Sequence, residues 1–175
     1  MVAAPPGWEE PAILVAEELA AAKVAAVVTG GETRAGSVRA AVAEVPPEAL
    51  VVLVHDAARP LLDDALLERL LAPLAEGVDG VVPALPLADT VKRVCGGLVV
   101  ETVDRADLVA AQTPQAFVAE ILRRALAGDP GEATDCASLV ERGGVRVRVV
   151  DGDARLLKVT TQADLDLVER LLARA

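Results

Sequence analysis

The chain has 175 residues, of which 53% are hydrophobic and 1% aromatic, and its formal net charge at pH 7 is -10. This length allows one compact domain, whose core valine, leucine and alanine must build. The acidic balance excludes a broad basic surface for nucleic acid or anionic membranes. With one Trp and one Phe, the chain also lacks the aromatic platforms on which nucleic-acid bases stack.

The two cysteines, Cys95 and Cys136, are too few and too far apart for a disulfide framework or a zinc site. We expect both to be small buried side chains in a reducing compartment. The first residues lack the regions of a signal peptide, and charges such as Glu17 and Lys23 interrupt the apolar runs before the roughly 20 residues that a membrane span needs. We therefore expect a cytoplasmic protein with no membrane partner.

Short β-branched runs alternate with alanine- and leucine-rich stretches of helical period, which predicts an α/β fold with a mostly parallel sheet flanked by helices. In chain order we expect strands at 24–28, 49–54, 80–85, 145–150 and 156–159. Helices are expected at 34–45, 61–74, 116–127, from 134 to near 143, and from a near-capping box at Thr161 onwards. Since no linker or repeat interrupts the pattern, residues 1–175 are predicted to form a single domain.

Residues 89–105 differ from this pattern. Two extended runs of mixed polarity are separated by Gly96-Gly97, and a Gly-Gly connection is a strong hairpin signal because both residues can take positive φ. We expect a projecting β-arm there. Because the edges of an exposed arm are unpaired, the arm is predicted to form a homodimer.

Polar residues that follow apolar strands are the candidate site residues, since ligands bind beyond the carboxyl ends of strands in open α/β sheets. Asp56 could bind a ribose or a divalent cation, and Arg59 could hold a phosphate through its planar fork. A structural pair between the Asp56 carboxylate and a nearby arginine explains the same spacing equally well. Lys158 precedes the start of a helix, where an anion is favoured.

Other polar residues have a structural interpretation that the pattern alone favours. Gly30-Gly31 can simply form a turn, with Arg34 on the helix surface and Ser37 as a buried hydroxyl. His55, the only histidine, is interpreted as a packing residue with satisfied hydrogen bonds rather than a general base. Charged residues on the arm, such as Arg105, would ordinarily form a solvated face.

Six motifs in one order change these interpretations. They are V-H-D-A-A-R-P at 54–60, D-T-V-K-R at 89–93, T-V-D-R at 102–105, Q-T-P-Q-A-F at 112–117, T-D-x-A-S-L-V-E at 134–141 and L-K-V-T at 157–160. Together they resemble the 2-C-methyl-D-erythritol 4-phosphate cytidylyltransferase family. The resemblance implies a Rossmann-like nucleotidyltransferase of the non-mevalonate isoprenoid pathway, which joins CTP to methylerythritol phosphate with Mg²⁺ and releases pyrophosphate.

The family's site residues can be carried over to matching positions. Nucleotide contacts are implied at Gly31, Glu32, Ser37, Asp56 and Ala57, with Glu32 replacing a more usual Asp and Asp56 on the magnesium side. Arg59, Thr90 and Thr113 would hold the methylerythritol phosphate, while Arg105 and Lys158 would position its attacking oxygen as catalytic residues. In this family the arm is exchanged within a dimer. Such a site needs no covalent nucleophile, since positioning and cations supply most of the catalysis of nucleotidyl transfer.

The start of the chain departs from the family pattern. Members begin with a strand, a glycine-rich phosphate loop of the type A-A-G-x-G-x-R-M-G and a P-K-Q motif, whereas residues 1–7 resemble the end of a later strand. We expect a first βα unit to be missing, either through a start placed too far downstream or by truncation, in which case the chain could be inactive. Two other hypotheses stay open: a cytidylyltransferase for another polyol phosphate such as ribitol 5-phosphate, and a non-catalytic remnant.

Overall fold

A five-stranded mixed sheet forms the centre of the computed structural model, which describes residues 1–128 and 133–173. Its strand order is β3 (Val51–Val54), β8 (Gln115–Val118), β4 (Gly80–Pro86) and β7 (Val109–Ala111), with β9 (Val147–Asp151) paired to β4. The α/β fold is thereby confirmed. The main sheet is not mostly parallel as expected: among its described strands β4 and β9 pair in parallel, whereas β3–β8, β8–β4 and β4–β7 are antiparallel.

The antiparallel pairs arise from two strands that the sequence pattern did not indicate. Residues 116–118 were expected to begin a helix, but they belong to β8, and α4 (Ala119–Ala127) starts only after them. Chain segments returning from the arm form β7 and β8, and β8 lies between β3 and β4. The predicted helix began too early because alanine is an excellent helix former. In the structure, strand pairing on both edges of β8 overrides this local helix propensity.

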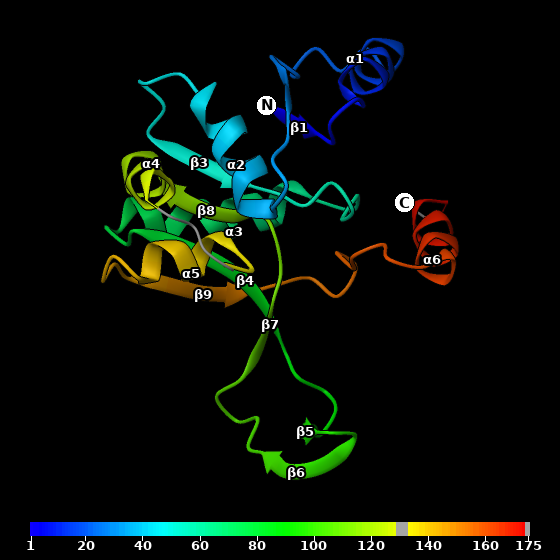
Figure 1. Cartoon of the computed structure of the whole chain (residues 1–175), viewed down its shortest axis with the longest axis vertical. Coiled ribbons are helices and arrows are strands. Elements are labelled where there is room, and N and C mark those ends of the chain that lie inside the picture. The colour runs from blue at the N-terminus through cyan, green and yellow to red at the C-terminus, as the bar shows by residue number, and fades with distance from the viewer. Residues whose placement is uncertain (129–132, 174–175) are drawn as a thin grey trace.

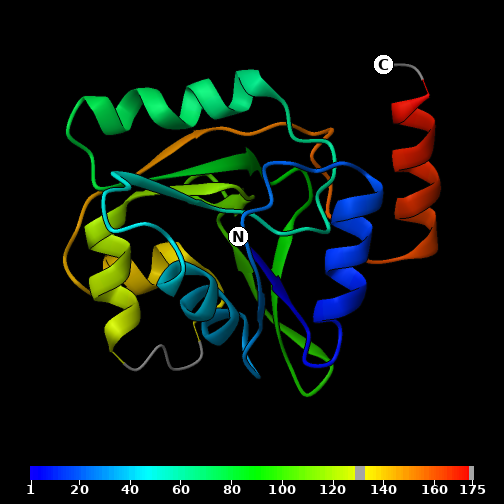
Figure 2. The ribbon, with the colours of Figure 1, turned by 90° about the horizontal axis from the view of Figure 1, so that it is seen from above.

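Helices cover both faces of the sheet (Figure 2). One face packs against α3 (Asp64–Ala75), and the other carries α2 (Arg34–Ala43), α4 and α5 (Cys136–Glu141). Neighbouring strand residues therefore point into different cores: Val81 packs with the α3 side, and Val82 and Phe117 with the other. A strand buried on both faces is apolar throughout rather than alternating, which explains the continuous runs in the sequence.

The N-terminal segment forms a second, two-stranded sheet. Strand β1 (Val2–Ala4) pairs in parallel with β2 (Val27–Thr29) across α1 (Glu9–Glu18). Within the described residues, β1 pairs with β2 alone, so its second edge is free. Among the same residues, β3 is an edge strand of the main sheet, with β8 on one side and no strand on the other. Between these two edges lies a groove of about 430 Å³, lined by β1, α2 and β3.

The predicted arm is present and projects from one end of the sheet (Figure 1). It consists of β5 (Val91–Cys95) and β6 (Leu98–Val103), joined by Gly96 and Gly97 at φ values of +57° and +81°. These positive angles are the reason for two glycines. One detail was wrong: Cys95 is exposed at the tip of the arm, whereas Cys136 is buried as expected.

The last helix, α6 (Gln162–Leu172), begins with the predicted capping box between Thr161 and Asp164. The strand expected at residues 156–159 does not form. This segment instead packs the fully buried Leu156 against α3 and donates the Val159 amide to the Ala58 carbonyl at 2.8 Å. Among the described residues, no helix has both the length and the apolar character that a bilayer span requires.

Replacing Phe117 by alanine should remove about 3–5 kcal/mol from the free energy of unfolding, because the ring is fully buried and fills the space beside Gly80. Urea unfolding followed by circular dichroism measures the change. Leu50→Ala is the control, since Leu50 is 83% exposed and should cost no more than about 0.5 kcal/mol. Equal losses in the two variants would contradict this account of the core.

Candidate active site

The carboxylate of Asp56 lies just beyond the end of β3 and is held by two cations. Arg34 donates from Nε and Nη2 to Oδ1 at 3.2 and 3.1 Å. The Lys158 Nζ lies 3.0 Å from the other oxygen, Oδ2. The Asp56 side chain is 17% exposed, and those of Arg34 and Lys158 are 30% and 46% exposed. Three segments that are distant in sequence thus meet at one carboxylate.

Two opposing effects act on the pKa of Asp56. Burial raises it, but the hydrogen bond from Lys158 and the positive charge of Arg34 outweigh burial, so the pKa lies below its usual value. Asp56 is therefore ionised at neutral pH, which is the state required of a metal or ribose ligand.

Arg34 is a site residue whose role the sequence pattern missed. It is the first residue of α2, whose N-terminus is capped by the Thr33 hydroxyl accepting from the Gly36 amide at 3.0 Å. Its Nη1 also lies 3.5 Å from the Cys136 sulfur. Burial raises the pKa of that thiol, so Cys136 serves as a neutral packing group. The position of Arg34 could have indicated its role, because α2 starts at the same edge of the sheet at which β3 ends.

Arg59 belongs to the same loop and still has an unused donor. Its Nη1 donates to the Leu156 carbonyl at 2.8 Å, whereas its Nε is buried and has no hydrogen-bond partner among the described residues. Burial lowers the pKa of Arg59, against the opposing charge of Asp56. A buried donor without a partner costs about 1–3 kcal/mol.

Gln112 and Gln115 are buried polar residues that position the surroundings of the site, and neither was predicted to do so. The Gln112 amide accepts from the Asp153 N–H at 3.0 Å and donates to the Asp153 carbonyl at 2.9 Å, which anchors the segment leading to Lys158. The Gln115 Oε1 accepts from the first two amides of α5, both at 3.1 Å. The motif Q-T-P-Q-A-F could have indicated both residues, because it places two glutamines in one short stretch of the chain.

The predicted nucleotide-binding residues divide between two neighbouring surfaces. Ser37, Asp56 and Ala57 line the groove between β1 and β3 together with Arg34. Gly31 and Glu32 line an adjacent cleft of about 490 Å³ at the start of α2. The Gly31 amide donates to the Ser37 hydroxyl at 3.1 Å, and a Cβ at Gly31 would come within 2.9 Å of Gly36, so glycine is required there.

The structure does not bring every predicted residue to this cluster. Thr90 and Arg105 lie at the base of the arm, and both are exposed. Within the described residues of one chain, neither forms a hydrogen bond or ion pair with Asp56, Arg59 or Lys158. Thr113, by contrast, is buried beside Asp56, whose amide donates to its hydroxyl at 2.9 Å.

A magnesium ion fits Asp56 only with help from other ligands. No group of three or more His, Cys, Asp or Glu residues in the described part of the chain could hold a metal. The hard carboxylate oxygens suit Mg²⁺, which commonly takes one or two protein carboxylates plus phosphate oxygens and water. Since Lys158 and Arg34 occupy the two Asp56 oxygens, Lys158 would have to release Oδ2 for a cation to bind there.

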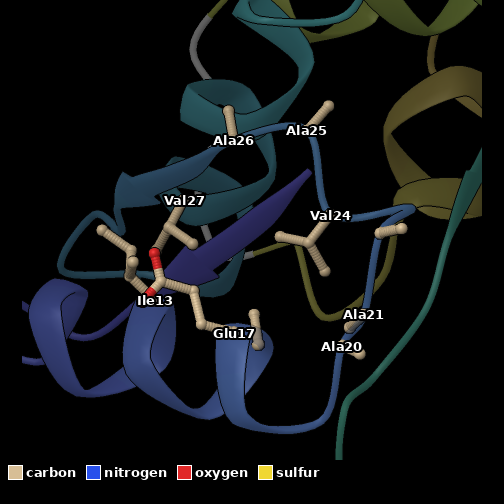
Figure 3. Close-up of a pocket in the computed structure, with 10 residues that line it drawn as sticks. Ile13, Glu17, Ala20, Ala21, Val24, Ala25, Ala26 and Val27 are labelled. Carbon is tan, nitrogen blue, oxygen red and sulfur yellow. The ribbon is translucent and has the colours of Figure 1, made fainter.

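Another cavity lies elsewhere, between α1 and the segment at residues 20–27 (Figure 3). It measures about 530 Å³ and is lined by alanine, valine and Ile13, with Glu17 as its one charged residue. Such a lining offers nothing that could orient a phosphorylated substrate. The cluster around Asp56 is therefore the better candidate site than this cavity.

Comparison with known proteins gives this geometry a family. Residues 9–174 match the family model described as 2-C-methyl-D-erythritol 4-phosphate cytidylyltransferase. The protein of that name from Nocardia farcinica (strain IFM 10152) is 49% identical over 175 residues, which cover 99% of this chain and 74% of that protein. This chain belongs to the 2-C-methyl-D-erythritol 4-phosphate cytidylyltransferase family.

Two further relatives support this family assignment. The cytidylyltransferase of the same name from Rhodococcus opacus (strain B4) is 51% identical over 147 residues, covering 83% of this chain and 65% of that protein. The crystal structure of the one from Thermus thermophilus has a TM-score of 0.77 at 37% identity, over 86% of this chain and 74% of the other. The family, the α/β nucleotidyltransferase fold and the enzyme class expected from the motifs are thus confirmed.

Asp56→Asn should lower the free energy of unfolding by about 1–3 kcal/mol at neutral pH, because it removes the charge held by Arg34 and Lys158. The folded-state pKa of Asp56 is depressed, so its contribution is present above the unfolded value of about 3.9 and is lost as the pH falls through the folded value. Urea unfolding of both proteins at several pH values should show the difference shrinking below about pH 4. A difference that does not vary with pH would contradict this, and Glu48→Gln on the surface is the control.

Proposed function

We propose that this protein transfers the cytidylyl group of CTP to 2-C-methyl-D-erythritol 4-phosphate and releases pyrophosphate, as a step of isoprenoid biosynthesis. The observation that carries the proposal is the Asp56 carboxylate with Arg34, Lys158 and Arg59 around it, in a member of this family. Two anionic substrates repel each other, so the reaction depends on cations that align them. The chain's net charge of -10 makes such a local cluster the means of holding an anion.

The contacts and the family resemblance together support the individual roles proposed here. Arg59 would hold the polyol phosphate, because its guanidinium is fixed by the Leu156 carbonyl close to the charge of Asp56. Lys158 would leave Asp56 Oδ2 and, with Arg105, position the attacking oxygen. Asp56 would then bind Mg²⁺, whose part is to neutralise charge on the phosphates. The cytidine side of the groove would be lined by Ser37, Ala57, Gly31 and Glu32.

Pyrophosphate release from CTP, Mg²⁺ and methylerythritol phosphate tests the proposal. The assay should be run on this chain and on a longer version that starts upstream, because this chain spans about three quarters of the N. farcinica relative. Lys158→Met should reduce turnover by about 10²–10³-fold in whichever version is active, whereas Lys23→Met, which removes an exposed lysine outside the Asp56 cluster, should not.

Each of the competing hypotheses has its own outcome in that assay. Release with ribitol 5-phosphate in preference to methylerythritol phosphate would replace the substrate while keeping the enzyme class. If neither version releases pyrophosphate with either acceptor, the result would favour a non-catalytic remnant. Activity that appears only in the longer version would show that a first βα unit is needed, and the groove between β1 and β3 is where an added strand could pair with both free edges.

We also propose that the arm at residues 89–105 forms a homodimer. An isolated two-stranded hairpin is marginal in water, yet β5 and β6 pair with no other strand among the described residues and are exposed along almost their whole length. Val94, Leu98, Val99 and Val100 are 57%, 74%, 62% and 58% exposed. A second copy of the arm would cover these side chains and could bring Thr90 and Arg105 to its partner's site.

Replacing Leu98 and Val99 together by aspartate should shift the protein from dimer to monomer, because the two buried carboxylates would face an apolar partner surface. Sedimentation velocity across a range of concentrations measures this. The matched control is Leu19→Asp with Leu50→Asp, which changes two equally exposed leucines away from the arm. A wild-type monomer, or a dimer unaffected by the arm substitutions, would refute the dimer proposal.

A cytoplasmic location completes the proposal. Its support is chemical: Cys95 is a free, exposed thiol and Cys136 a free, buried one, and neither is in a disulfide. Unpaired, exposed thiols are typical of reducing compartments.

A further inference from the structure

The side chain of Gln112 joins two parts of the chain that β4 keeps apart. Strands β7 and β9 flank β4, with Ala84 opposite Ala111 on one edge and opposite Asp151 on the other. Gln112 directly follows β7 and is 5% exposed. Its side chain is hydrogen-bonded to the turn at residues 153–156, which leaves β9. One buried amide thus ties together the ends of two strands on opposite sides of a third.

This side-chain amide uses all of its protons on that turn. Its Oε1 accepts from the Asp153 N–H at 3.0 Å, and its Nε2 donates to the carbonyls of Asp153 and Leu156 at 2.9 and 3.4 Å. A backbone N–H can only donate and a carbonyl can only accept, so these partners fix which end of the Gln112 amide is the nitrogen. Both amide protons face carbonyl oxygens, which leaves Gln112 no donor for a ligand. It therefore acts on the protein rather than on a substrate.

The turn fits closely around this side chain. A Cβ added at Gly152 would collide with the Gln112 Oε1 and would lie 3.0 Å from the Ala84 carbonyl oxygen. The Gly152 amide donates to the same Ala84 carbonyl at 2.9 Å, and the Leu156 amide closes the turn by donating to the Asp153 carbonyl at 3.0 Å. The glutamine and the turn therefore form one packed unit that needs glycine at its start.

The Leu156 carbonyl connects this unit to two cations of the candidate site. It accepts from the Arg59 Nη1 at 2.8 Å as well as from Gln112, which its two lone pairs allow. Lys158 follows two residues later and reaches Asp56 Oδ2 at 3.0 Å. A displaced Leu156 would therefore move the guanidinium of Arg59 and the ammonium of Lys158 together.

We propose that Gln112 is a positioning residue for the half of the site that holds the polyol phosphate. It fixes Arg59 and Lys158 relative to each other, because both depend on the turn that it binds. Within the described residues, none of its hydrogen bonds goes to the residues proposed to line the nucleotide groove. The kinetic consequence rests on the proposed cytidylyl transfer, whereas the restraint on the turn rests on the contacts alone. Misplacing a substrate-holding group by about 1 Å is enough to cost about 10²-fold in rate.

Amide hydrogen exchange, followed by NMR on the ligand-free protein, tests the restraint without any activity. The Val159 amide lies three residues beyond the turn, and its 2.8 Å bond is to the Ala58 carbonyl rather than to Gln112. Gln112→Met keeps the length of the side chain but removes its hydrogen bonds, so exchange at Val159 should become about tenfold faster or more. The Val118 amide, in the central strand β8, reports on global unfolding and should change less.

The matched control is Gln115→Met, which removes a second buried glutamine amide. Gln115 holds the first amides of α5, so this variant should speed exchange at Ala137 and leave Val159 unchanged relative to Val118. Gln112→Asn is a milder change in case Gln112→Met does not fold: it keeps an amide that is one methylene too short, and exchange at Val159 should be intermediate. Exchange at Val159 that matches the wild type in the Gln112 variants, or that rises only in step with Val118, would overturn the proposal.

Steady-state kinetics on the active version test the consequence for the site. Gln112→Met should raise the KM for the polyol phosphate and lower kcat, with kcat/KM for that substrate reduced about 10–100-fold and the KM for CTP unchanged. A loss of folded protein alone would lower kcat and leave both KM values unchanged; that result, or an equal rise in both KM values, would overturn the proposal. If the wild type transfers no cytidylyl group in either version, the proposed reaction fails, and exchange at Val159 still decides whether Gln112 holds the turn.

Discussion

One carboxylate connects the parts of this protein. Asp56 lies just beyond the end of β3, Arg34 begins α2, and Lys158 lies in the segment before α6, so the two ion pairs of Asp56 join the end of the sheet, a covering helix and the C-terminal segment. Surface ion pairs contribute little, but this carboxylate is mostly buried, and removing either cation would leave its charge compensated by the other cation alone. The same contacts that hold the fold together at this edge therefore hold the candidate catalytic groups in place.

The position of β8 explains why these contacts are possible. Because β8 lies between β3 and β4, it places Thr113 beside the loop after β3, and Gln115 against the start of α5. Gln112 reaches the 153–158 segment from the same stretch of chain. A parallel strand at this position would connect through a helix and would present a different end to the site. The antiparallel return from the arm is thus what delivers three polar side chains to one edge.

Much of this architecture could be predicted from the sequence because its signals are local. Apolar runs indicated β3 and β4, Gly96-Gly97 indicated the hairpin, and Asp135 and Thr161 marked helix starts, all of which depend on neighbouring residues. What could not be predicted depends on pairing across the chain. β8 resembles a helix start until two strands flank it, and Arg34 resembles a surface residue until the end of β3 places Asp56 beside it. The segment at 156–159 has the composition of a strand, but its amides meet a loop rather than a sheet edge.

The proposed division of the site between body and arm would follow from charge. A protein of net charge -10 must concentrate its cations to attract anionic substrates, and the body supplies Arg34, Arg59 and Lys158 around a single carboxylate. One of these charges is needed to keep Asp56 in place, which leaves few to neutralise a triphosphate and a polyol phosphate together. Arg105 lies at the base of an exposed arm whose apolar side chains remain uncovered in one chain. A second copy that covers the arm would bury these apolar side chains. The same contact would carry Arg105 to the neighbouring site as an additional cation.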